Sequence, residues 1–189
     1  MQFGIPRREL LKTLPLAAVG ATVAGKAAVS QVPPQIRSTL VVYFARTGNT
    51  TVIAKQIRRS KNADLAEIIP VDPYPEDYKE TVSQASRETE AGYLPPLKPL
   101  TVEVARYDTL YLGFPIWGMT APPVIRSFLR SNSLAGKTIY LFITHGGYGL
   151  GSSIEVLHSH LDGAKMQPAF SMEADQERRT LEQVTGWLG

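Results

Sequence analysis

The sequence predicts an α/β protein of three layers, in which helices cover both faces of a five-stranded parallel sheet. Three observations carry this prediction. Short apolar runs, of the kind found in strands buried on both faces, alternate with segments of helical periodicity. Loops containing glycine or proline separate them, and such alternation is typical of parallel sheets. The length of 189 residues suits one domain of ordinary size.

The first part of the pattern contains two strands, two helices and a connector. Residues 39–44 are a continuous apolar run and predict a buried strand, and residues 51–59 have apolar side chains at helical spacing. Residues 65–69 predict a second strand that a proline ends. Residues 76–90 are polar and predict a surface helix. Residues 92–99 contain a Pro-Pro pair and predict a rigid extended connector.

The middle of the chain repeats the strand-helix-strand order. Residues 109–113 predict the third strand and residues 138–143, which are continuous and aromatic, predict the fourth. Residues 122–130 predict a helix that begins with proline, where a missing N–H group costs little.

The last three elements follow the same alternation. Residues 152–161 predict a helix capped by serine, and residues 176–188 predict a closing helix. Residues 165–172 are the weakest strand in the pattern, because Pro168 cannot donate to a ladder and indicates a sheet edge or a break.

The composition excludes several classes of protein. The formal net charge is +3, but residues 1–30 hold four basic residues and one acidic residue, so the rest of the chain holds 16 of each sign. A body without a basic surplus offers little to nucleic-acid phosphates, so we expect no nucleic-acid partner. The absence of cysteine excludes a disulfide scaffold, a thiolate zinc site and a cysteine nucleophile.

Residues 1–30 resemble a twin-arginine-type signal peptide in the order of their residues. Arg7 and Arg8 precede two leucines and a lysine, and the uncharged run at residues 13–25 follows. This run is too short for a membrane-spanning helix, which needs about 20 apolar residues, but it has the length of a signal-peptide apolar core. The alternative is a chance Arg-Arg pair before a poorly ordered start.

Small residues before position 30 fit cleavage near Ser30. Cleavage there would leave residues 31–37 as a short linker before a domain at residues 38–189. We therefore expect a periplasmic or other extracytoplasmic location, with no stable membrane span after cleavage.

The loop at residues 45–50 has the composition of a phosphate cradle. Gly48 permits a tight turn, side chains of Thr47, Asn49 and Thr50 supply donors, and the following helix start adds backbone N–H groups. The Gly-Lys-Ser/Thr ending of the nucleoside-triphosphate loop is missing, as is the Gly-x-Gly-x-x-Gly spacing of the dinucleotide fingerprint. The alternative is an ordinary polar turn that caps a helix.

Two more loops follow the third and fourth strands. Residues 113–123 place the flat ring of Trp117 beside proline and glycine, although Trp117 could instead be a core aromatic. Residues 144–153 contain four glycines within six residues, which suits close approach of backbone to a ligand. His145 could donate a proton there, but a structural loop role is the simpler interpretation.

Residues 41–50, Val-Val-Tyr-Phe-Ala-Arg-Thr-Gly-Asn-Thr, resemble the flavodoxin signature that binds the phosphate of flavin mononucleotide (FMN). Ala45 stands where the family usually has a hydroxyl. The loops at residues 113–123 and 144–153 resemble the second and third flavin loops of the same family. In the second loop, Gly118 and Met119 replace a Trp and a Gly, so the resemblance leaves ring stacking to Trp117.

The resemblance implies a flavodoxin-like fold with strand order 2-1-3-4-5 and FMN as the cofactor. It implies no catalytic side chain and no metal ligand. The cofactor-binding residues that it implies are Arg46, Thr47, Gly48, Asn49, Thr50, Pro115, Ile116, Trp117, Gly118, Thr144, Gly146, Gly147, Tyr148 and Gly149.

The function implied is that of an exported redox protein that passes electrons through FMN to a protein partner or to a small acceptor such as a quinone. Typical electron carriers of the family are strongly acidic, so the balanced charge of residues 31–189 weakens the interpretation of this protein as an electron carrier. The redox partner is not identified by the sequence. The second possibility is a non-catalytic flavin-binding or scaffold protein that kept the fold.

Replacing Arg7 and Arg8 together with lysine should abolish export, because a twin-arginine route needs the paired guanidinium groups. The expected result is flavin-loaded precursor in the cytoplasm, since a site built from three distant loops exists only in the folded chain. Cell fractionation with flavin absorbance measures this. Normal export of the double variant would contradict the assignment of the leader.

Overall fold

The computed structural model describes residues 39–173 and 177–189, which lie within one unit, Gln35–Gly189. A parallel sheet has strand order β2-β1-β3-β4-β5, and β6 also pairs with β4. The strands are β1 (Thr39–Tyr43), β2 (Asp64–Glu67), β3 (Thr109–Pro115), β4 (Thr138–His145), β5 (Lys165–Met166) and β6 (Phe170–Glu173). The predicted fold class and strand order are confirmed.

The α-helices fall where the periodicity predicts them, with ends that differ by at most three residues. They are α1 (Asn49–Lys61), α2 (Tyr78–Glu90), α3 (Pro123–Ser131), α4 (Ser153–His158) and α5 (Glu177–Leu188). The 3-10 helix η1 (Val104–Arg106) was not predicted. The predicted signal peptide at residues 1–30, the linker at residues 31–37 and the predicted helix start at position 176 lie outside the described residues.

The predicted fifth strand is two short strands along β4. Lys165 pairs with Thr138 at the start of β4, and Glu173 pairs with His145 at its end. Pro168 lies in the gap between β5 and β6, where its missing N–H group interrupts the ladder. The expected break is therefore confirmed, and the expected single strand at residues 165–172 is corrected to two.

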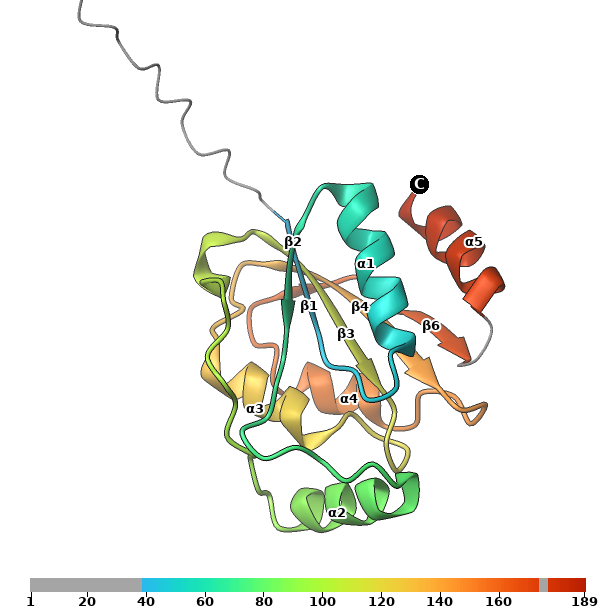
Figure 1. The fold of residues 1–189 in the computed structure, drawn as a ribbon. Helices are drawn as coiled ribbons and strands as arrows, with labels where there is room; N and C mark the ends of the chain where they lie inside the picture. Colours follow the sequence, from blue (N-terminus) through green and yellow to red (C-terminus); the bar gives the residue numbers. More distant parts are fainter. Residues whose placement is uncertain (1–38, 174–176) are drawn as a thin grey trace, which may run out of the picture. The chain divides into compact units, whose positions relative to one another are not determined.

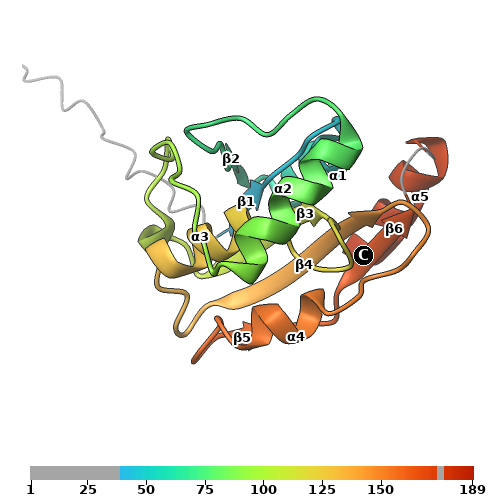
Figure 2. The ribbon, with the colours of Figure 1, turned by 90° about the horizontal axis from the view of Figure 1, so that it is seen from below.

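Helices cover both faces of the sheet (Figure 1), and each face has its own apolar core. On one face, Ile53 and Ile57 of α1 and Val184 of α5 pack with Val41 and Phe142 of the strands. On the other face, α3 and α4 pack on the alternate strand residues. Figure 2, seen from below, shows α3 and α4 on the side of the sheet away from α1 and α5. Successive residues of a strand thus pack against the helices on opposite faces of the sheet.

Helix α2 belongs to the layer of α3, where its Ala85 joins the core. The segment before α2, which joins β2 to α2, lies at the end of the sheet where β1 and β3 terminate (Figure 1). Tyr74, within this segment, packs against the same core. The segment therefore borders the loops that follow β1 and β3. Within residues 39–173 and 177–189, no helix combines the length and apolar character that a membrane span needs.

Replacing Gly113 with alanine should destabilise the sheet. Gly113 of β3 is the register partner of Phe142 of β4, and a Cβ atom at Gly113 would lie 2.0 Å from the Phe142 ring. Overpacking of this kind costs about 1–3 kcal/mol of unfolding free energy. Urea unfolding measures the loss.

Gly186 provides the matched control, because a Cβ atom there meets nothing within 4 Å and the residue lies within a helix. Gly186→Ala should leave the unfolding free energy unchanged or raise it by up to about 1 kcal/mol. Equal effects of the two substitutions would mean that β3 and β4 do not pack this closely.

Candidate functional site

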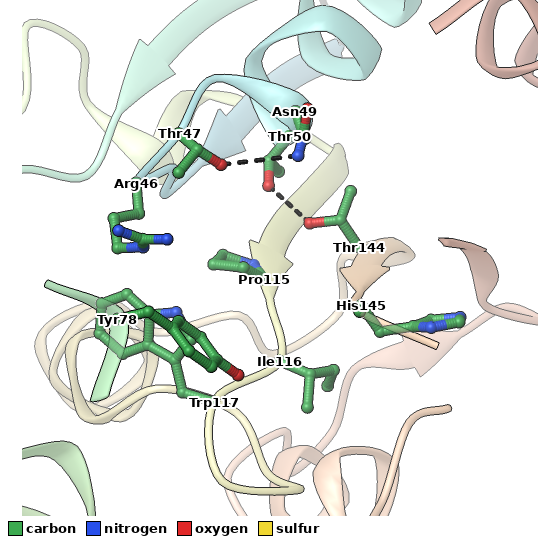
Figure 3. Close-up of a pocket in the computed structure, with 11 residues that line it drawn as sticks. Arg46, Thr47, Asn49, Thr50, Tyr78, Pro115, Ile116, Trp117, Thr144 and His145 are labelled. Atoms are coloured by element: carbon green, nitrogen blue, oxygen red, sulfur yellow. Dashed lines mark hydrogen bonds between the residues drawn. The ribbon is translucent and has the colours of Figure 1, made fainter. Parts of the chain in front are cut away.

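Three loops that follow neighbouring parallel strands meet at a cavity of about 240 Å³ (Figure 3). The loops leave the carboxyl ends of β1, β3 and β4, which is the edge where open α/β sheets bind ligands. The lining residues are Arg46, Thr47, Asn49, Thr50, Tyr78, Pro115, Ile116, Trp117, Thr144, His145 and Gly146.

The first loop ends in a helix start that is open to a ligand. Gly48 occupies the N-cap position of α1 with φ +95°, so the capping residue has no side chain that could accept a hydrogen bond from the first turn. A Cβ atom on Gly48 would meet nothing within 4 Å, which shows open space beside the loop. The Thr47 hydroxyl and the Asn49 amide lie next to this space, 3.5 Å apart. Backbone and side-chain donors thus converge at the positive end of a helix dipole.

A buried hydrogen bond joins the first loop to the third. The hydroxyls of Thr50 and Thr144 lie 2.9 Å apart, and both residues are buried. Thr50 is the second residue of α1, whereas Thr144 lies near the end of β4. The bond therefore fixes the distance between the two loops. It also engages the hydroxyl of Thr50, one of the three side chains that the sequence pattern assigned to a ligand, and either hydroxyl can be the donor.

The second loop is a tight turn that is locked to the start of α4. Trp117 and Thr120 exchange two backbone hydrogen bonds of 3.1 Å. The backbone between them is left-handed at Gly118, with φ +54°, and at Met119, with φ +64°. The Ser152 N–H donates to the Met119 carbonyl at 2.9 Å. A left-handed methionine is held in an unfavourable conformation by these contacts.

Trp117 lies in the wall of the cavity but is only 2% exposed. Phe44 contacts its ring edge to face, with 5.2 Å between ring centroids, and Tyr74 does so at 4.8 Å. The Tyr74 hydroxyl donates to Glu88 of α2 at 2.5 Å. Burial, and then the Glu88 carboxylate, raise the pKa of Tyr74. Trp117 thus borders the cavity and also joins the apolar core.

Tyr78 is a cavity residue that the sequence pattern did not identify. It is the first residue of α2 and is 52% exposed. The Arg46 guanidinium carbon lies 5.4 Å from the centroid of its ring. In Figure 3, Arg46, Tyr78 and Trp117 lie on one side of the cavity and Thr144 and His145 on the other. No periodicity in the sequence predicts that Tyr78 lines the cavity, because this depends on how the segment before α2 folds back toward the first loop.

Five of the expected binding residues do not line the cavity: Gly48, Gly118, Gly147, Tyr148 and Gly149. Tyr148 is 82% exposed. The Nδ1 atom of His145 accepts from the Gly147 N–H at 3.2 Å, which agrees with a structural role for His145. Among the residues that the structure describes, no three histidine, aspartate or glutamate side chains gather as metal ligands.

A family model described as Flavodoxin matches residues 38–188. The chain is also similar to solved structures of two candidate flavoproteins. One, from Bacteroides eggerthii, is 30% identical with a TM-score of 0.69, over 80% of this chain and 95% of that one. The other, from Bacteroides uniformis, is 29% identical with a TM-score of 0.68, over 78% of this chain and 97% of that one.

A flavoprotein from Lactobacillus acidophilus NCFM, solved in complex with FMN, shares the fold at 19% identity with a TM-score of 0.64, over 77% of this chain and 98% of that one. Among curated proteins, an FMN-dependent NADH:quinone oxidoreductase from Staphylococcus haemolyticus is 29% identical over 93 residues, which cover 49% of this chain. The match spans 44% of the relative's length, so the chain covers less than half of it.

The hydrogen bond between Thr50 and Thr144 can be measured with a double-mutant cycle. Each threonine-to-valine substitution leaves the other buried hydroxyl without its partner, so each single variant should lose about 1–3 kcal/mol of unfolding free energy. The double variant should lose clearly less than the sum, because no hydroxyl is then left unpaired. Additive losses in denaturant unfolding would mean that the two loops are not joined through this bond.

Proposed function

Since this chain belongs to the flavodoxin family, we propose that it binds FMN in the cavity between its three loops and acts as an exported redox protein. The observation that carries the proposal is the meeting of the three loops at the open start of α1. FMN supplies reversible electron transfer when it is bound. The chain's own residues hold it, orient it and limit its contact with water.

The first loop fits the phosphate of FMN. The donors there are the Thr47 hydroxyl, the Asn49 side-chain amide and the backbone at the start of α1. Among the cavity-lining residues, Arg46 is the one that carries a permanent charge, and that charge is positive. The donor set and the charge therefore both favour a dianionic group. Ala45 provides no hydroxyl, which removes one hydrogen bond from the family's pattern.

The remaining walls fit a flat apolar ring. Pro115, Ile116 and Trp117 form one apolar stretch, and Gly146 allows backbone to approach. Ligand cavities are commonly apolar with a few placed polar groups, whereas this cavity combines one apolar stretch with polar side chains from the first loop and the end of β4. No side chain of the lining is required to act as an acid or a base, because the cofactor carries the chemistry.

For the electron acceptor we propose a small molecule of the quinone class. The support is the similarity to the staphylococcal FMN-dependent NADH:quinone oxidoreductases, over about half of this chain. The balanced charge of residues 31–189 also favours a small acceptor over a strongly basic protein partner. The alternative electron acceptor under the same proposal is a protein partner.

We also propose export through the twin-arginine route to the periplasm or an equivalent compartment. The support is the order of Arg7, Arg8, the leucines and the short apolar run in the leader. A route that accepts folded cargo suits a protein whose cofactor site needs a finished sheet.

A non-catalytic flavin-binding protein is the second candidate. The specific observations in its favour are Ala45 in the first loop and the engagement of Thr50 with Thr144. Absorption spectra of the purified protein separate the two candidates. Bound flavin that is reduced and reoxidised reversibly, with turnover of a quinone, supports the redox protein. Bound flavin without turnover supports the second candidate.

Replacing Thr47 with alanine should weaken FMN binding by about 1.5–3 kcal/mol, because a hydrogen bond to a charged phosphate is lost. Riboflavin, which has no phosphate, should bind as it does to the unchanged protein. Fluorescence titration of the apoprotein with both ligands measures the difference.

Thr101 provides the matched control, since it is exposed and is not among the cavity-lining residues. Thr101→Ala should change neither affinity. If Thr47→Ala leaves the preference for FMN over riboflavin intact, the first loop does not hold the phosphate.

A further inference from the structure

The cavity wall holds two aromatic side chains that differ in the ring surface they offer. Trp117 is 2% exposed, because Phe44 and Tyr74 both pack against its ring. Tyr148 is exposed but does not line the cavity. Tyr78 lines the cavity and is 52% exposed. Tyr78 is therefore the aromatic residue of the wall with ring surface available to a ligand (Figure 3).

Contacts from two elements hold the segment that carries Tyr78. The Arg46 Nη1 atom donates to the Glu76 carbonyl at 2.8 Å. The Asp77 side chain accepts from the Glu80 N–H at 2.9 Å and so caps α2 one residue before Tyr78. The Thr81 hydroxyl donates to the Pro75 carbonyl at 2.7 Å. The start of α2 is thus held by hydrogen bonds within its own segment and by one from the first loop.

Arg46 contacts the ring of Tyr78 as well as the backbone beside it. The distance of 5.4 Å from the guanidinium carbon to the ring centroid is within the range of a cation–π contact. The same side chain lines the cavity. Arg46 therefore connects the proposed phosphate loop with the aromatic ring of α2, two features that are 32 residues apart in the sequence.

We propose that Tyr78 supplies the aromatic face against which the flavin ring stacks, and that Arg46 is the positioning residue that holds Tyr78 there. This inference rests on the proposed binding of FMN. It transfers to Tyr78 the stacking role that the resemblance assigned to Trp117, whose ring is covered by Phe44 and Tyr74. Trp117 then serves as support beneath the site.

The proposal divides the binding free energy between two parts of the ligand. Tyr78 contacts the ring, which FMN and riboflavin share, so its loss should weaken both ligands by the same factor. Thr47 contacts the phosphate, so its loss should weaken FMN alone. This contrast separates a stacking residue from one that only supports the fold of the first loop.

The experiment compares Tyr78→Phe and Tyr78→Leu with a control, Tyr93→Leu. Tyr93 is 50% exposed and does not line the cavity. Apoprotein is titrated with FMN and with riboflavin, and the fluorescence of the bound flavin is recorded. Tyr78→Leu should weaken both ligands about tenfold and should restore part of the flavin fluorescence that a stacked ring quenches. Tyr78→Phe should keep at least a third of the affinity and most of the quenching, and Tyr93→Leu should change neither.

The role of Arg46 is tested with Arg46→Lys, which keeps the positive charge but loses the planar guanidinium. Riboflavin is the informative ligand, because it has no phosphate that the charge could attract. Arg46→Lys should weaken riboflavin binding in the presence of Tyr78 and should have little further effect in the Tyr78→Leu background. Such non-additivity shows that Arg46 acts on the ring through Tyr78.

The outcomes distinguish this inference from the proposed function. If the unchanged protein binds neither flavin, the proposed function fails. If it binds FMN tightly and Tyr78→Leu matches Tyr93→Leu in affinity and quenching, the stacking role of Tyr78 is overturned. Tyr78→Trp gives an independent measurement in case the leucine variant does not fold. Its additional tryptophan emission should be strongly quenched when FMN binds, and an unquenched emission would also overturn the proposal.

Discussion

The parallel pairing of β1, β3 and β4 is the constraint on which the site depends. Tyr43 pairs with Gly113, and Gly113 pairs with Phe142, so the three strands run in register to a common edge. The backbone ladder continues past the ends of the strands, because the Phe44 N–H donates to Gly113 at 2.9 Å and the Ile116 N–H donates to Thr144 at 2.8 Å. The three loops, at residues 45–50, 113–123 and 144–153, therefore begin side by side although they are far apart in the sequence.

Local patterns were sufficient to predict the elements of this sheet. A strand buried on both faces needs a continuous apolar run, and β1, β3 and β4 each have one. The interruption at Pro168 was equally readable, because the missing donor is a property of that one residue. The open helix start at the first loop was predictable for a related reason. Gly48 and the donors beside it are consecutive in sequence, so their arrangement depends on one turn.

The parts of the site that were not predicted depend on contacts between distant residues. The exposure of Trp117 is set by Phe44 and Tyr74, which lie more than 40 residues before it. Whether the Thr50 hydroxyl can contact a ligand depends on its hydrogen bond with Thr144. Tyr78 enters the cavity because the segment before α2 returns to the first loop, where Arg46 binds it. Composition and spacing contain no information on these pairings, because each depends on how separate elements pack.

Helix α2 also explains how the second loop differs from the family pattern. A second tryptophan usually follows Trp117 in the family, whereas this chain has Gly118 with φ +54°. A Cβ atom at Gly118 would lie 3.6 Å from the Ser86 hydroxyl oxygen and 3.7 Å from a Val82 methyl group. Both belong to α2, so this helix already lies in the direction in which a larger side chain would extend. The same helix presents Tyr78 to the cavity from its first turn. The aromatic surface missing from the second loop is therefore matched by Tyr78 of α2, which Arg46 of the first loop contacts through the ring and through the backbone beside it.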